Sequence, residues 1–277
     1  MKRMNEGIRC GVHTIELTTK EPILFENLHL KAYRAIKAIS GKRYHFNLPK
    51  YTGTEYLPTD KTEQAISEAL EVCRDRRGGL PLVTRIDWRV DSYSATYREL
   101  LPIMRPFVYV FAYRYGLYDR RLETTKGIGG EPETVRAMPE EKTDEPRGIE
   151  YYNKPLQAKD ESYGKARLEL RRLNLNGESL SSVIEMWRRE LQQITKADYM
   201  AMLEAHAREL YQNHFTAGNR IGAFIRDMRP FLIGKEQERM LYQLADKTPQ
   251  RRKTCEGLPR WKDVEQAIHQ VITLLRK

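Results

Sequence analysis

The sequence predicts an α+β fold: a central, mostly antiparallel sheet with helices on one face, followed by a helical C-terminal region. Up to about residue 177, short runs of alternating apolar and polar residues are interleaved with helical patterns. From Glu178 onward, Gly and Pro become sparse and apolar residues recur at helical spacing. We therefore expect two domains, an α+β domain at 1–177 and a basic helical region at 178–277.

The expected elements follow from these periodicities. Apolar residues recurring every three or four positions predict helices near 26–39, 61–76 and 94–115. Further helices are expected in LSSVIEMWRREL, ADYMAMLEAHARELY and VEQAIHQVITLL of the second half. Successive side chains of a strand point to opposite faces, so alternation predicts strands. These are expected at 8–17, 43–48, 82–91, 133–138, 148–154 and 165–171.

Composition favours a folded protein with a polyanionic partner. Hydrophobic residues make up 40% and charged residues 31% of the chain, which excludes wholesale disorder. The net charge is +10 and the isoelectric point is about 9.4. Basic side chains gain affinity by displacing counterions from phosphates, so this charge raises the expectation of a nucleic-acid partner without identifying it.

Nothing in the sequence predicts export or a cysteine-based metal site. No apolar run approaches the roughly 18 residues that span a bilayer, and the opening MKRMNEGIRCGVHTIEL lacks the apolar stretch of a signal peptide. We expect a cytoplasmic protein with no membrane partner. The 3 cysteines are far apart in the sequence, which favours buried or incidental thiols over disulfides or zinc ligands.

Three of the predicted strands oppose an apolar face with a polar one. If the strands at 148–154 and 165–171 pair as a hairpin, Tyr152 lies on one surface with Arg167 and Glu169. If the strand at 82–91 is their neighbour, it adds two Asp residues to this surface. An ordinary solvated face accounts almost as well for Arg85 and Arg89. The polar sets are Arg85, Asp87, Arg89 and Asp91 in TRIDWRVD (84–91), Glu150, Tyr152 and Lys154 in GIEYYNKP (148–155), and Lys165, Arg167, Glu169 and Arg171 in KARLELRR (165–172).

Such a surface carries the groups that phosphoryl transfer needs. Carboxylates can hold a divalent cation that polarises a phosphate, and Arg and Lys side chains can neutralise charge developing on phosphorus. Tyr152 can supply the nucleophile, since nearby positive charge or metal favours attack by a phenol whose ordinary pKa is about 10. Tyr151 is the rival, but alternation assigns it to the apolar face with Ile149, so we prefer Tyr152.

A basic tract lies between two of the predicted C-terminal helices. In KTPQRRKTCEGLPRWK, Glu256 is the single acid among the basic residues. A loop of this kind can contact DNA phosphates, although a solvated loop without function is an equally good interpretation. Its basic residues are Lys247, Arg251, Arg252, Lys253, Arg260 and Lys262.

At these residues the sequence resembles the replication initiation factor family of plasmid rolling-circle initiators and related conjugative-element relaxases. The matching elements occur in the family's order and cover roughly the central third of the chain. They are TRIDWRVD at 84–91, GEPETV at 130–135, IEYYNK at 149–154 and ARLELR at 166–171. The resemblance implies a nicking-enzyme-like fold in which Tyr152, in a YxK element with Lys154, cuts one DNA strand at a hairpin origin and becomes joined to its 5′ phosphate. It also implies a homodimer and recruitment of a helicase encoded by the host or the element.

The resemblance further implies acidic ligands for Mg²⁺ or Mn²⁺, namely Asp87 and Glu169, with Asp91 as a third. Together with the residue pattern, it leads us to expect Tyr152, Lys154 and Arg167 as the catalytic groups. The expected DNA-binding residues are Arg85, Arg89, Arg171, Arg251, Arg252 and Lys253.

Two other interpretations stay open at this point. The chain can be a non-catalytic, sequence-specific DNA-binding protein of a plasmid or mobile element, with the sheet as a scaffold. It can also be a replication endonuclease of the filamentous-phage type, which also uses tyrosine chemistry. Covalent attachment of DNA to Tyr152 separates the enzyme from the binding protein, whereas neighbouring genes separate plasmid, conjugative and phage elements.

Overall fold

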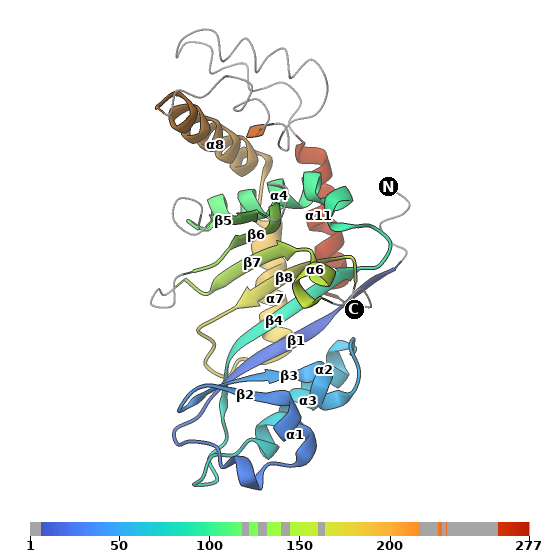
Figure 1. The fold of residues 1–277 in the computed structure, drawn as a ribbon, viewed down its shortest axis with the longest axis vertical. Helices are drawn as coiled ribbons and strands as arrows, with labels where there is room; N and C mark the ends of the chain where they lie inside the picture. The colour runs from blue at the N-terminus through green and yellow to red at the C-terminus, as the bar shows by residue number, and fades with distance from the viewer. Residues whose placement is uncertain are drawn as a thin grey trace.

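An antiparallel sheet of eight strands runs through the part of the chain that the structure, a computed structural model, describes. Described are residues 7–117, 122–126, 132–139, 145–159, 164–216, 227–228, 231 and 260–276. The strands lie in the order β2-β3-β1-β4-β8-β7-β6-β5 (Figure 1). They are β1 (Ile8–Thr18), β2 (Ile36–Ser40), β3 (Arg43–Asn47), β4 (Leu82–Ser92), β5 (Leu122–Lys126), β6 (Pro132–Ala137), β7 (Arg147–Tyr152) and β8 (Ala166–Arg172). The predicted α+β class, with an antiparallel sheet, is confirmed.

Long helices cover one face of this sheet. Tyr97 of α4 stacks on Tyr151 of β7 with 4.8 Å between ring centroids, and 6.4 Å separates the ring centroids of Trp187 in α7 and Trp88 in β4. The short α6 lies over the opposite face (Figure 1). The helices are the 3₁₀ turn η2 (Phe25–Asn27), α1 (Leu30–Ala35), α2 (Leu48–Thr52), α3 (Thr59–Val72), α4 (Tyr97–Arg114), α6 (Lys154–Ala158), α7 (Leu180–Gln192), α8 (Lys196–Thr216) and α11 (Trp261–Leu274).

One predicted helix is wrong in its second half. The segment 26–39 contains α1, which ends at Ala35, and then β2, which pairs with β3 so that Ile36 lies opposite Phe46. Pairing with β3 satisfies the backbone groups of β2 that face this neighbour and buries Ile36 near Phe46. These tertiary contacts outweigh the local helical spacing. The other predicted elements lie within a few residues of the observed ones, whereas β2, β5, α2 and α6 were not predicted.

The described helices after Glu178 contribute side chains to the same hydrophobic core as the sheet. Trp187 of α7 and Val271 of α11 belong to the same buried apolar cluster as Leu168 of β8. The helical character predicted for this region is confirmed at α7, α8 and α11. The segment 251–253 of the basic tract lies outside the described residues. Within the described ranges, no helix is both long enough and apolar enough to cross a membrane.

Candidate active site

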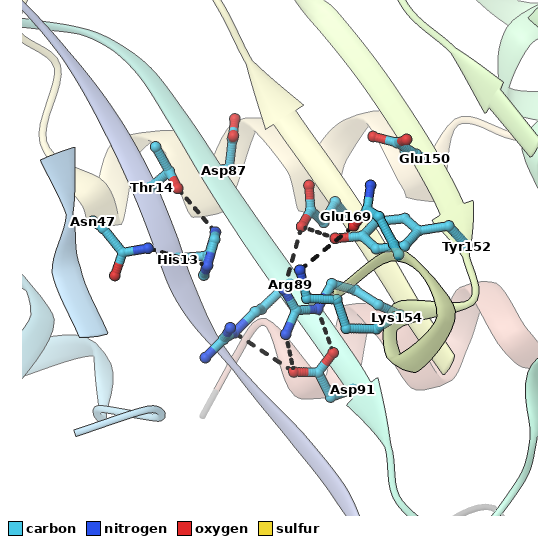
Figure 2. Close-up of polar contacts among 12 residues, drawn as sticks. His13, Thr14, Asn47, Asp87, Arg89, Asp91, Glu150, Tyr152, Lys154 and Glu169 are labelled. Atoms are coloured by element: carbon cyan, nitrogen blue, oxygen red, sulfur yellow. Dashed lines mark hydrogen bonds and ion pairs between the residues drawn. The ribbon is translucent and has the colours of Figure 1, made fainter. Parts of the chain in front are cut away.

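Strand register brings the polar side chains of β4, β8 and β7 into rows across the sheet. Tyr152 of β7 lies opposite Arg167 of β8, which lies opposite Asp91 of β4. The next row joins Glu150, Glu169 and Arg89, and the third joins Arg171 and Asp87. We call this surface the polar patch, made up of Asp87, Arg89, Asp91, Glu150, Tyr152, Arg167, Glu169 and Arg171. Figure 2 shows Asp87, Arg89, Asp91, Glu150, Tyr152 and Glu169 of this patch. The hairpin and the shared surface predicted from alternation are both present.

The Tyr152 hydroxyl donates a hydrogen bond to Glu169 Oε1 at 2.6 Å. Burial raises the pKa of Tyr152, and the negative charge of Glu169 raises it further. Burial also raises the pKa of Glu169, but the charge of Arg171 and the bond from Tyr152 outweigh burial and bring it to about 2. The resting pair is therefore a neutral phenol beside an ionised carboxylate.

Tyr151, the rival nucleophile, lies on the other face of the sheet. Its hydroxyl donates to the carbonyl oxygen of Tyr97 at 2.9 Å, within the apolar core. Tyr151 is 1% exposed and Tyr152 is 3% exposed, so burial does not separate the two. Their surroundings do, because only Tyr152 faces the charged groups of the polar patch.

Arg167 forms the buried centre of the first row. It is 0% exposed and holds Asp91 with two bonds, from Nε to Oδ1 at 2.6 Å and from Nη2 to Oδ2 at 2.8 Å. Burial lowers the pKa of Arg167, and the bonds to Asp91 outweigh burial and raise it. Among the described side chains, Arg167 Nη1 is a buried nitrogen without a hydrogen bond, and it lies 3.7 Å from Glu169 Oε1. This side of the guanidinium therefore faces the carboxylate of Glu169.

Lys154 stands at the first position of α6, next to Tyr152. The helix begins here because the Asn153 side chain accepts a hydrogen bond from the Leu156 backbone N–H and Pro155 occupies the first turn. Lys154 Nζ lies 5.8 Å from the centroid of the Tyr152 ring. Burial and the charge of Arg167 lower the pKa of Lys154. Tyr152 and Lys154 lie together (Figure 2), and the third predicted catalytic group, Arg167, lies opposite Tyr152 on β8.

The three carboxylates predicted as metal ligands are not brought together. Asp87 and Asp91 are four residues apart on β4, so their Cα atoms lie about 13 Å apart. Each carboxylate also faces a guanidinium: Asp87 pairs with Arg85, Asp91 with Arg167 and Glu169 with Arg171. In the described ranges, no three His, Cys, Asp or Glu residues are grouped so that they could hold a metal ion. As placed, this donor set does not fit a cation held by all three.

The predicted DNA-binding arginines of the sheet are engaged within the protein. Arg85 holds Asp87 through Nε at 2.7 Å, and Arg171 bonds both Glu150 and Glu169. Arg89 is 1% exposed and bonds the carboxylate of Glu55, which is itself half exposed. A phosphate that binds these arginines therefore competes with the carboxylates that they already hold. The other predicted contacts, Arg251, Arg252 and Lys253, lie outside the described residues.

His13 joins this site although its sequence context did not point to it. It sits where β1 shifts register against β4, between Val12 and Thr14, so simple alternation does not reveal its face. Asn47 Oδ1 accepts from the Lys50 backbone, so Asn47 Nδ2 donates to His13 Nε2. Burial and the charge of Arg89 lower the pKa of His13 to about 3, so the imidazole is neutral at pH 7.

Two further groups lie at this site. Glu150 of β7, which alternation places on the polar face but to which no role is assigned from the sequence, lies opposite Glu169 of β8. Tyr56 lies in the loop after α2 and donates from its hydroxyl to Asp91 Oδ2 at 2.5 Å. No local pattern indicates this contact, because it joins positions 35 residues apart.

Comparison with known proteins leaves the family open. No protein-family model matches the chain, and no curated protein matches it. One solved structure with some similarity is a rolling circle replication initiator protein from Geobacillus stearothermophilus. It is 11% identical, with a TM-score of 0.36, and the match covers 65% of this chain and 78% of that chain. A likeness of this degree establishes neither a family nor a function.

Proposed function

We propose that the protein is a rolling-circle replication initiator or relaxase that nicks one DNA strand at an origin through a covalent 5′-phosphotyrosine intermediate at Tyr152. One observation carries the proposal: the Tyr152 hydroxyl donates to Glu169 at 2.6 Å on the face that also holds Arg167. A phenol beside a proton acceptor and fixed cations has the groups needed to attack a phosphodiester.

The proposed step is an in-line displacement at phosphorus. The Tyr152 oxygen forms a bond to phosphorus, its proton passes to Glu169 Oε1, and the bond from phosphorus to the 3′ oxygen of the preceding nucleotide breaks. That 3′ oxygen takes a proton from water and becomes a free hydroxyl. Arg167 and Lys154 neutralise the charge that builds up on the phosphate oxygens. The phosphotyrosine keeps the bond energy for later rejoining.

Binding of the phosphodiester has to change the resting site. Transfer of a proton from the Tyr152 phenol, whose pKa is raised, to a carboxylate with a pKa of about 2 is uphill. A phosphate that draws the guanidinium of Arg171 or Arg167 away from Glu169 raises the basicity of that carboxylate. Tyr152 is 3% exposed, so access also requires Lys154 and the α6 turn to move aside.

A divalent cation, Mg²⁺ or Mn²⁺, is part of the proposal through the family resemblance alone. Because the carboxylates face arginines, no step above is assigned to the ion. We expect covalent attachment to DNA to cease in excess chelator and to return with Mg²⁺ or Mn²⁺. Undiminished attachment after exhaustive chelation would remove the cation from the proposal.

The decisive experiment is a search for the protein–DNA adduct. Full-length protein is incubated with labelled single-stranded oligonucleotides that contain candidate hairpin origins, and a covalent band is sought on a denaturing gel. Mass spectrometry then maps the modified residue. We expect an adduct at Tyr152 and a new 3′ hydroxyl end. An adduct at another tyrosine, or none with any origin-like DNA, would contradict the proposal.

The second candidate function is a non-catalytic, sequence-specific DNA-binding protein. The burial of the Tyr152 hydroxyl favours it, because a phenol bonded to Glu169 inside a network of ion pairs can serve structure alone. This candidate predicts specific binding of duplex DNA without strand cleavage. The adduct experiment therefore separates the two.

DNA with a hairpin origin, single-stranded at the nick, is the proposed substrate, and the proposal includes a homodimer, a recruited helicase and a cytoplasmic location.

We expect the 247–262 tract to contact duplex phosphates. Changing Arg251, Arg252 and Lys253 together to Ala should then weaken duplex binding at least tenfold and flatten its salt dependence, while cleavage of single-stranded substrate persists. Fluorescence anisotropy across a salt series measures this. Unchanged affinity would rule the tract out as a contact.

A further inference from the structure

We propose that Arg9, Tyr56 and Tyr93 form a stacking platform for an unpaired DNA base that flanks the scissile phosphate. This inference rests on the proposed function, because it names how the substrate strand is held beside Tyr152. The three residues come from β1, from the loop after α2 and from the residue that follows β4. Below, they are called the stacking platform.

In the stacking platform, the exposed guanidinium of Arg9 lies over the partly exposed rings of Tyr56 and Tyr93. The Tyr56 and Tyr93 rings meet edge to face with 6.5 Å between centroids, and their hydroxyl oxygens lie 2.9 Å apart. The Arg9 guanidinium lies 5.0 Å from the Tyr93 centroid and 5.8 Å from the Tyr56 centroid. Arg9 is exposed and both tyrosines are partly exposed. A nucleobase can stack on the tyrosine rings that Arg9 contacts. It can lie between Arg9 and a ring, or it can replace Arg9 over a ring.

The stacking platform is joined directly to the polar patch. Tyr56 donates to Asp91, and Asp91 is held by Arg167, which lies opposite Tyr152. Asp91 and Tyr152 are two strand spacings apart, so their Cα atoms are about 10 Å from each other. A nucleotide next to a phosphate at Tyr152 is within reach of the platform rings.

The guanidinium groups beside the stacking platform favour a ligand that carries both aromatic bases and phosphates. Arg89 lies under Tyr56, with its guanidinium carbon 4.7 Å from the ring centroid, and Arg9 lies at its outer side. Two guanidinium groups at a pair of tyrosine rings offer stacking surface together with attraction for a phosphate backbone. A paired base presents only its edges in the grooves of a duplex, so these partly exposed rings suit single-stranded DNA.

The test measures stacking separately from cleavage. Single-stranded oligonucleotides carrying 2-aminopurine are titrated with full-length protein in which Tyr152→Phe prevents covalent attachment, and both fluorescence and anisotropy are recorded. We expect Tyr93→Ala to weaken binding about tenfold and to remove the fluorescence change that stacking causes. Tyr93→Phe keeps the ring and should retain both signals. Arg9→Lys keeps the charge without the planar group and should lose most of the fluorescence change.

Tyr33→Ala is the matched control, because Tyr33 is an exposed tyrosine (54%) on α1, away from the polar patch. It should leave both signals unchanged. Equal losses for Tyr33→Ala and Tyr93→Ala, or full binding and fluorescence change in Tyr93→Ala, would overturn the stacking platform. If the wild-type protein never forms an adduct but Tyr93→Ala still loses base stacking, the proposed nicking function fails while the stacking platform stands.

Discussion

Tyr152→Phe is expected to abolish covalent attachment to DNA, lowering the rate of adduct formation by on the order of a thousandfold or more. The substitution removes only the hydroxyl that donates to Glu169, and it keeps the ring beside Lys154. DNA binding should stay within a few-fold of wild type, because no cation is removed. Parallel measurements of adduct yield and of equilibrium binding on the same oligonucleotide check both statements.

The matched control for this prediction is Tyr151→Phe. It removes a hydroxyl of similar burial, which donates to the Tyr97 carbonyl on the opposite face. We expect a loss of stability of about 1 kcal/mol and retained adduct formation. The reverse outcome, with Tyr152→Phe active and Tyr151→Phe inactive, would move the nucleophile to the apolar face and refute the proposed mechanism.

Asp91→Ala is expected to lower the free energy of unfolding by about 3–5 kcal/mol. The substitution leaves the guanidinium of Arg167, which is 0% exposed, without its two-point partner and also removes the acceptor of the Tyr56 hydroxyl. Removing one partner of a buried ion pair costs more than replacing both, because the remaining charge stays buried without its hydrogen-bonded counterion. Glu169, 3.7 Å from Arg167 Nη1, offsets only part of this cost. Urea unfolding monitored by circular dichroism measures the change.

Two controls separate an unpaired buried charge from simple truncation. The double variant Asp91→Leu with Arg167→Met removes both charges, and we expect it to recover most of the lost stability. Glu71→Ala breaks the surface pair with Arg74 and should cost less than about 1 kcal/mol. An Asp91→Ala protein as stable as Glu71→Ala would show that the buried pair does not hold the polar patch together.

Alternation was the most informative signal for the site. It placed Tyr152 with Glu150 and Tyr151 with Ile149, as the structure has them. Lys154 also lies near Tyr152, but as the first residue of α6 and not as part of the strand. The side-chain period of a strand is a property of its own backbone, so a short stretch of sequence suffices to assign faces. The same reasoning predicted the polar sets of β4 and β8.

Other features could not be predicted because they depend on contacts between distant segments. His13 joins the site through a register shift between β1 and β4, and Tyr56 reaches Asp91 from a loop. Ile36 belongs to a strand rather than a helix because β3 is available to pair with it. In each case the deciding partner lies outside the window in which periodicity is read.

By itself, the sequence determined the α+β class, most of the strands and the residues that share each strand face, because these follow from local backbone geometry. Only the tertiary structure decided that Arg167 of β8 meets Asp91 of β4 and that Arg171 of β8 meets Glu150 of β7, because these pairs join different strands. The physical reason is that strand register and burial depend on the whole sheet, and both determine which charges meet at a distance that matters.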